Sequence, residues 1–303
     1  MGITYGGGWI PLILVKLLFT QAIIIQCHAT GLWPFASEKD GSSSSSPNLI
    51  LVMGLPRSGS LALHHFFECN GLRSANYCCG NSKETSFPCE SPSSSTTKVT
   101  TCGDCVFQNM KALRPAFQGC GNYQVFSQFD VESGDPFAWF LPQHYTLPLL
   151  YENYPNATWI LNTRETPERW ATNVLHWYSV TTRILRSFGL EYHDHIDKIT
   201  VELKHGVTNQ RLYQELDKGI ERAHDSVAHQ RRHAQLTMIY KQHSQEVKAF
   251  SRRFPSLKLV EINVDDPQAG SVLSQAFPSM GAKCWHFDAA VLDNDWQDFS
   301  FKL

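Results

Sequence analysis

The sequence predicts an α/β fold whose central sheet is mostly parallel and flanked by helices. Apolar runs of strand length alternate with segments of helical periodicity from residue 49 to residue 277. The first run passes into a loop with two glycines and then into a helix, and the run at residues 157–163 also leads into a helix. Strands that are joined through helices lie parallel in one sheet, with helices on both of its faces.

The first strand is expected at residues 49–53, LILVM, a run short enough for a strand that is buried on both faces. Residues 54–60, GLPRSGS, form the loop, and apolar residues at helical spacing follow over 61–67. This order brings backbone N–H groups and the positive end of a helix to one place, which is the arrangement of an anion site. Arg57 adds a permanent cation to the loop.

Residues 71–122 are predicted to be irregular and to be held together by cysteines. Six of the nine cysteines fall in or near this stretch, namely Cys78, Cys79, Cys89, Cys102, Cys105 and Cys120. In an oxidising compartment such a cluster indicates disulfides, although their connectivity cannot be deduced. Zinc is the alternative, because Cys102 and Cys105 have CxxC spacing. We favour disulfides, since the sequence offers no second CxxC pair.

The second and third strands are expected on either side of a proline-containing segment. Residues 123–130, YQVFSQFD, alternate in character and end in Asp130. Residues 137–152 contain two prolines and are expected to form short helices. Residues 157–163, ATWILNT, form the third strand, and Asn156 just before it starts an N-glycosylation sequon.

Helices dominate the remainder of the chain. Pro167 is expected in the first turn of a helix, where proline is tolerated. Residues 209–253 carry apolar stripes at helical spacing and are predicted to form long helical segments. Residues 257–264 are expected to form the last strand, and residues 266–277 the last helix.

The N-terminal region indicates entry into the secretory pathway. Residues 9–26 form an apolar stretch interrupted only by Lys16, which fits either a signal peptide or a signal-anchor. We therefore expect a signal peptide or membrane anchor over 1–29, a flexible Ser-rich stem over 30–47 and a folded domain over 48–303.

Composition limits the classes of partner. The chain has 303 residues, 42% hydrophobic content and a formal net charge of −2. This length and apolar content suit one large α/β domain. The near-neutral charge gives no indication of nucleic-acid binding, and none is expected; any anion site must be local.

A second candidate anion site follows the third strand. Arg164 stands at the carboxyl end of that strand, where open parallel sheets bind ligands, and Thr172 lies eight residues later, about two helical turns on. A guanidinium and a hydroxyl at this separation can hold one phosphate from two sides.

The two motifs together resemble those of sulfotransferases. GLPRSGS is similar to their 5′-phosphosulfate loop, and residues 155–172 are similar to their 3′-phosphate motif, with Thr172 where serine is usual. The ATPase loop differs, because it carries Lys where this chain has Ser60. The resemblance implies a P-loop NTPase-like sulfotransferase fold, here with a disulfide-rich loop insertion. It also implies the donor 3′-phosphoadenosine 5′-phosphosulfate (PAPS) and sulfuryl transfer without a metal.

The resemblance also implies roles for individual residues. Arg57 would contact the transferring sulfonate and the leaving oxygen, and Arg164 and Thr172 would hold the 3′-phosphate. The 5′-phosphate would lie on the backbone of Ser58, Gly59, Ser60 and Leu61. Asp130 is our candidate for the base that accepts the acceptor's proton. His64 and His65 are weaker candidates.

We therefore expect a PAPS-dependent sulfotransferase that binds PAPS and its product PAP and acts on a carbohydrate hydroxyl or amine. The N-terminal features predict a Golgi lumen protein, either a single-pass type II membrane protein or secreted. Two alternatives remain open: a catalytically inactive lumenal nucleotide- or glycan-binding protein of the same fold, and a P-loop kinase.

Overall fold

The structure is a computed structural model that describes residues 48–79, 100–132, 139–190 and 227–285. The predicted N-terminal segment, the Ser-rich stem and Cys89 lie outside these described residues. Within the described part of the chain, no helix combines the length and apolar character needed to cross a membrane.

The central sheet has five strands, all parallel, in the order β2-β5-β1-β8-β9. The prediction of a mostly parallel α/β fold is thus confirmed. The strands are β1 (Ile50–Val52), β2 (Ser74–Asn76), β5 (Val125–Gln128), β8 (Thr158–Thr163) and β9 (Lys258–Asn263). Because the sheet is parallel, the carboxyl ends of β5, β1, β8 and β9 come side by side at one edge.

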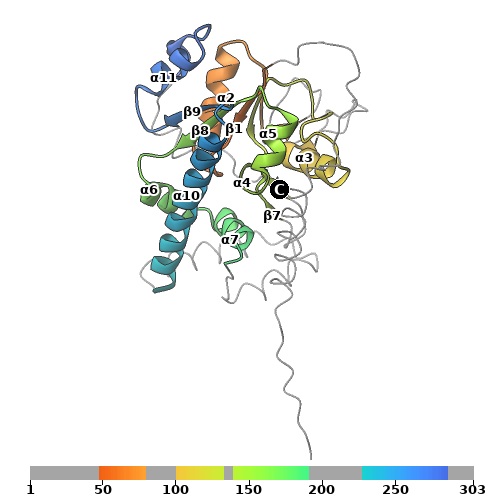
Figure 1. The fold of residues 1–303 in the computed structure, drawn as a ribbon. Helices are drawn as coiled ribbons and strands as arrows, with labels where there is room; N and C mark the ends of the chain where they lie inside the picture. Colours follow the sequence, from red (N-terminus) through yellow and green to blue (C-terminus); the bar gives the residue numbers. More distant parts are fainter. Residues whose placement is uncertain (1–47, 80–99, 133–138, 191–226, 286–303) are drawn as a thin grey trace, which may run out of the picture. The chain divides into compact units, whose positions relative to one another are not determined.

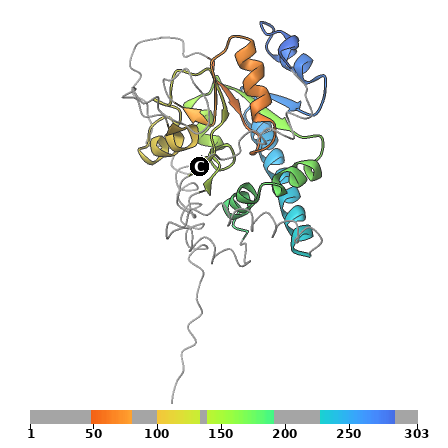
Figure 2. The same ribbon diagram turned by 180° about the vertical axis from the view of Figure 1, so that it is seen from behind.

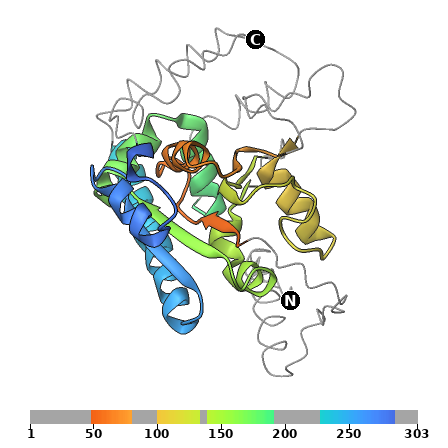
Figure 3. The same ribbon diagram turned by 90° about the horizontal axis from the view of Figure 1, so that it is seen from above.

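Helices cover both faces of the sheet, and each side has its own apolar core (Figures 1 and 3). One face packs against α3 (Cys102–Lys111), α5 (Leu147–Asn153) and the carboxyl half of α10 (Val227–Arg253). The other packs against α2 (Ser60–Cys69) and α11 (Ala269–Ala276). Helices α3 and α10 stand at opposite ends of the sheet (Figures 1 and 2).

A third apolar cluster lies beyond the carboxyl edge of the sheet, where it supports the loops there. It joins α6 (Pro167–Leu175), α7 (Tyr178–Ser187) and the first half of α10 to Leu55 and Leu141. Two short helices, α4 (Pro142–Tyr145) and α5, follow in the proline-containing segment, as predicted. The helix expected from Pro167 is also confirmed, with the Thr166 hydroxyl accepting from the N–H of Arg169.

The expectation that residues 71–122 are irregular was wrong in two places. Strand β2 forms the edge of the central sheet, and α3 begins at Cys102 with the Thr101 hydroxyl accepting from the Asp104 N–H. A strand of three residues is too short to show a period, and α3 contains only a few apolar side chains. A small antiparallel pair, β3 (Cys78–Cys79) with β4 (Thr100–Thr101), also lies in this region, and a second pair, β6 (Val131–Glu132) with β7 (Trp139–Phe140), follows β5.

Disulfides cross-link the cysteine-rich region, as predicted. Cys79 pairs with Cys102, and Cys105 pairs with Cys120. Both cysteines of the CxxC pair are therefore engaged in disulfides, which rules out the alternative of a zinc site on them. A third disulfide, Cys69–Cys284, was not anticipated; it ties the end of α2 to η1 (Ala282–Cys284) across 215 residues of sequence.

Candidate functional site

The predicted phosphate loop connects β1 to α2 and lies at the carboxyl edge of the sheet. Both glycines are required by close contacts. A Cβ on Gly54 would lie 2.2 Å from Asn162 Oδ1, and a Cβ on Gly59 would lie 2.8 Å from Val264 Cγ2. Gly59 also has φ +85° and precedes the first turn of α2, so the loop passes directly into a helix N-terminus. This is the geometry of an anion site.

Arg57 occupies the third position of a turn within this loop. The turn is closed by the Ser58 N–H, which donates to the Leu55 carbonyl at 3.1 Å, and Arg57 has φ 69°. A non-glycine residue in the left-handed region is strained, and such strain gathers at functional sites. The Arg57 guanidinium carbon lies 4.7 Å from the centre of the Trp177 ring, a cation–π contact that orients the cation.

Asp130 lies just beyond the end of β5, the strand next to β1. Its side chain is buried at 4% exposure, and its Oδ1 has no hydrogen-bond partner. Burial raises the pKa of the Asp130 carboxyl, while hydrogen bonds from its own backbone and Gln128 and the charge of Arg183 act in the opposite direction. Two residues earlier, at the end of β5, Gln128 Oε1 accepts from the Ser60 hydroxyl at 3.4 Å. The acid is thus next to the loop.

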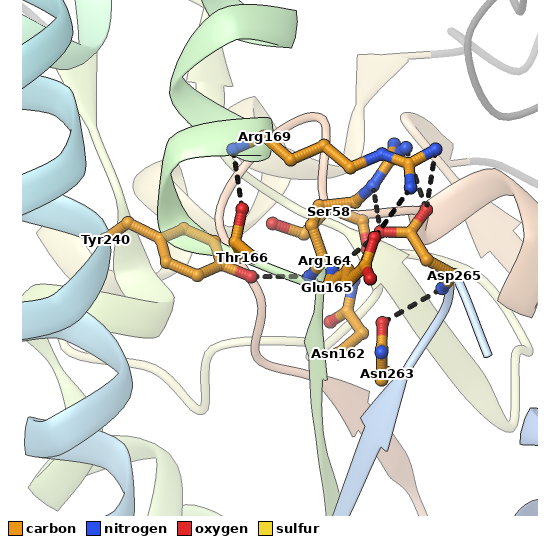
Figure 4. Close-up of polar contacts among 9 residues, drawn as sticks. All are labelled: Ser58, Asn162, Arg164, Glu165, Thr166, Arg169, Tyr240, Asn263 and Asp265. Atoms are coloured by element: carbon orange, nitrogen blue, oxygen red, sulfur yellow. Dashed lines mark hydrogen bonds and ion pairs between the residues drawn. The ribbon is translucent and has the colours of Figure 1, made fainter.

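Arg164 lies at the end of β8 in a buried ion pair with Asp265 (Figure 4). Its Nε and Nη2 each lie 2.9 Å from an oxygen of the Asp265 carboxylate, and its side chain is only 1% exposed. Asp265 also accepts from the backbone N–H of Glu165 at 2.7 Å, and Arg169 Nη2 approaches it to 3.7 Å. The backbone N–H of Arg164 donates to the Tyr240 hydroxyl of α10 at 2.6 Å. This pairing is the role that the structure displays for Arg164; contact with a 3′-phosphate stays a prediction.

Thr172 is exposed on α6 and faces α10. Its hydroxyl donates to the Glu168 carbonyl at 3.0 Å and lies 3.2 Å from His233 Nε2. His233 and Glu168 also line an open groove of about 520 Å³ between α6 and α10. The structure thus places Arg164 just after β8 and Thr172 within α6. The Arg164 guanidinium is held by Asp265, and the Thr172 hydroxyl donates to the Glu168 carbonyl and lies next to His233.

The two histidines that follow the loop differ in environment. His64 is buried, and burial together with the neighbouring His65 lowers its pKa to about 4. His65 is exposed.

Sequence reasoning missed the residues that hold the loop and Arg164. Asn162 and Trp170 donate to carbonyls of the loop, His243 contacts the Met53 carbonyl just before it, and Asp265 pairs with Arg164. Three of these had a visible signal. Asn162 is the polar residue inside the apolar run WILNT, and Asp265 directly follows the last predicted strand. Trp170 begins the apolar stripe of the helix after Pro167 and resembles an aromatic of the sulfotransferase 3′-phosphate motif, although its contact with the loop was not predicted. His243 had none, because a histidine in a long helix is unremarkable in sequence.

His243 is fully buried beneath the loop, and it makes the fold sensitive to acid. Its Nε2 lies 2.6 Å from the Met53 carbonyl, its Nδ1 lies 3.4 Å from His144 Nδ1, and His144 Nδ1 lies 3.1 Å from Glu246. Desolvation lowers the pKa of His243 to about 3, from an ordinary value of 6.5. Between about pH 3 and pH 6.5, His243 is protonated in the unfolded chain but neutral in the folded one. The stability contributed by neutral His243 is therefore complete above pH 6.5 and is lost as the pH falls towards 3.

We predict that the free energy of unfolding falls between pH 6.5 and pH 4.5, by up to about 1.4 kcal/mol per pH unit for each buried histidine of this kind. Urea unfolding at several pH values measures it. His243→Gln should flatten the slope, leaving contributions from His64 and His144, whose pKa values burial also lowers. An unchanged slope in His243→Gln would refute the assignment.

In the part of the chain that the structure describes, no group of three or more His, Cys, Asp or Glu side chains is arranged to hold a metal ion. The donor set around the loop is instead cationic and backbone N–H in character, which suits a phosphate or a sulfonate.

Comparison with protein families matches residues 124–271 to the model of a sulfotransferase domain. The match runs from the start of β5 into α11 and includes Asp130, Arg164 and Asp265, while the phosphate loop precedes it. No curated protein and no solved structure gives a match.

Proposed function

We propose that this chain, which belongs to the sulfotransferase family, transfers a sulfonate group from PAPS to a hydroxyl or amine acceptor. One observation carries the proposal. The loop with Arg57 follows β1, and the buried Asp130 lies just beyond β5, so both stand at the carboxyl ends of adjacent parallel strands. An anion site thereby stands beside a carboxylate that can take up a proton.

The residues of the loop fit a 5′-phosphosulfate. Two glycines without room for a Cβ and the N-terminus of α2 favour a bound phosphate on the backbone of Gly59, Ser60 and Leu61. The Ser58 N–H is instead engaged in the turn to Leu55. When PAPS is bound, attack by the acceptor atom on sulfur breaks the bond between sulfur and the bridging oxygen, and PAP leaves. Arg57 stabilises the negative charge on the sulfonate and on that oxygen.

Asp130 accepts the proton that the acceptor loses. Its burial makes the ionised form more basic than an exposed carboxylate, and a base with a pKa closer to the working pH removes a proton more effectively. Because the base must be ionised, turnover is expected to rise with pH through the pKa of Asp130.

We predict that Asp130→Asn lowers kcat by about 10²- to 10⁴-fold, as expected for loss of a general base. PAP affinity should stay within about twofold, because the side chain would act on the acceptor and not on the nucleotide. Steady-state kinetics and calorimetric titration with PAP measure the two effects. Asp266→Asn, which alters a carboxylate that caps the Gln268 N–H, is the control. Wild-type turnover in Asp130→Asn would eliminate it as the base.

For the other end of the nucleotide, we propose that Arg164 and Thr172 hold the 3′-phosphate. The position of Arg164 at the end of β8, next to β1, supports this assignment. Asp265 holds the Nε and Nη2 edge of the guanidinium and so fixes the orientation of its plane.

The acceptor and the compartment are also proposals. The disulfides are consistent with an oxidising lumen, and the predicted N-terminal segment would place the domain in the Golgi or outside the cell. We propose a carbohydrate acceptor on that basis, to be tested with a panel of glycan, peptide-tyrosine and lipid acceptors.

Two measurements test the function. The chain is expected to bind immobilised adenosine 3′,5′-bisphosphate and to transfer labelled sulfonate from PAPS to a member of the acceptor panel. Binding of ATP with Mg²⁺ in place of PAP would instead indicate a kinase. PAP binding without transfer to any acceptor would indicate a binding protein that has lost catalysis, and no nucleotide binding at all would refute the proposal.

A further inference from the structure

We propose that Trp170 and Asn162 are positioning residues of the phosphate loop, which fix the direction of two of its peptide groups. They thereby aim the Gly59 N–H at the 5′-phosphate, together with the Arg57 N–H, which this inference adds to the groups that bind that phosphate. This inference rests on the proposed function, because it assigns a role in binding the same donor.

The two side chains, from β8 and α6, donate hydrogen bonds to two carbonyls of the loop. Trp170 Nε1 donates to the Pro56 carbonyl at 2.9 Å, and Asn162 Nδ2 donates to the Ser58 carbonyl at 2.7 Å. Asn162 Oδ1 also accepts from the Gly54 N–H at 2.9 Å, so one amide joins both ends of the loop. Both side chains are buried, with 0% and 1% exposure for Trp170 and Asn162.

The direction of these carbonyls sets the direction of the next N–H groups. In a trans peptide the C=O and the N–H point in opposite directions. The N–H of Arg57 therefore points away from Trp170, and the N–H of Gly59 points away from Asn162. Turning either peptide over would leave a buried donor of Trp170 or Asn162 without its acceptor, which is costly.

The Pro56–Arg57 peptide is the one most in need of a restraint. It is the central peptide of the turn closed between Leu55 and Ser58, and Arg57 has φ 69°. A turn with proline second and a positive φ third corresponds to type II, which favours glycine at the third position. The commoner type I turn has this peptide reversed and φ negative. The Trp170 N–H thus selects the turn that directs both the backbone and the side chain of Arg57.

The chain offers a matched control for Trp170. Trp159 on β8 is also 0% exposed, yet its Nε1 has no hydrogen-bond partner. Trp159→Phe and Trp170→Phe remove the same atoms from buried positions, and only the second removes a hydrogen bond to the loop.

The experiment compares the affinities of the full chain for adenosine 5′-phosphate, adenosine 3′-phosphate and adenosine 3′,5′-bisphosphate by calorimetric titration. Trp170→Phe is expected to weaken binding of the two ligands with a 5′-phosphate by about five- to tenfold, the effect of one hydrogen bond, and to leave the 3′-phosphate ligand within about twofold. Trp159→Phe should leave all three ratios unchanged. Asn162→Ala should repeat the pattern of Trp170→Phe, and serves alone if Trp170→Phe does not fold.

Equal weakening of all three ligands, no weakening, or the same result in Trp159→Phe would overturn the positioning role while leaving the proposed function intact. Failure of the wild-type chain to bind adenosine 3′,5′-bisphosphate would instead overturn the proposed function, and this inference with it.

Discussion

Arg57→Ala is expected to lower kcat/KM for sulfonate transfer by about 10²- to 10³-fold, the loss seen when one charge-stabilising donor is removed from an active site. The charge of Arg57 is held over the Trp177 ring and directed by a strained backbone, so water cannot replace it with equal geometry. The loss should appear in kcat more than in PAP affinity, because the charge on the leaving oxygen grows only in the transition state. Labelled transfer from PAPS measures it.

Two variants sharpen this test. Arg57→Lys keeps the charge but not the planar fork of donors, so partial activity is expected. Arg73→Ala removes another arginine from above an aromatic ring, with 5.3 Å between its guanidinium carbon and Tyr123, at the start of β2 and away from the carboxyl edge. It should leave turnover unchanged. Full activity of Arg57→Ala would remove the guanidinium from the chemistry and weaken the case for an enzyme.

Arg164→Ala is expected to lower the free energy of unfolding by about 3–5 kcal/mol, because it leaves the carboxylate of Asp265 buried without its partner. The remaining contacts of Asp265, from the Glu165 N–H and the more distant Arg169, compensate only in part. Urea unfolding measures the change. In protein that still folds, the KM for PAPS should rise more than kcat falls, since a 3′-phosphate contact is made equally before and during transfer.

A matched control separates burial from ion pairing. Lys241→Ala breaks the pair with Glu168, whose two side chains are each about half exposed, and should lower the free energy of unfolding far less than Arg164→Ala does. Equal effects of the two substitutions would show that the buried pair contributes no more than a surface pair. Unchanged PAPS affinity in folded Arg164→Ala would remove Arg164 from the nucleotide site.

The sequence could predict those parts of the site that depend on local order along the chain. A strand, a glycine loop and a helix start in this order always bring the loop N–H groups to the N-terminus of the helix. The carboxyl ends of parallel strands likewise always lie at the same edge of the sheet. The loop at 54–60, Asp130 after β5 and Arg164 after β8 were therefore found where expected. Strand β2 was not, because its three residues show no period and it becomes a strand only by pairing with β5.

The sequence alone determined the α/β class and the order of the two candidate anion-binding motifs, because these depend on periodicity and on short spacings. It favoured disulfides in the cysteine cluster, and the structure decided for them against zinc. Only the tertiary structure decided that Asp265 pairs with Arg164, that Trp170 and Asn162 hold the loop, and that Cys69 joins Cys284. These contacts link residues separated by about 100 or more positions. Their geometry arises only when the strands align, and no local pattern of residues encodes it.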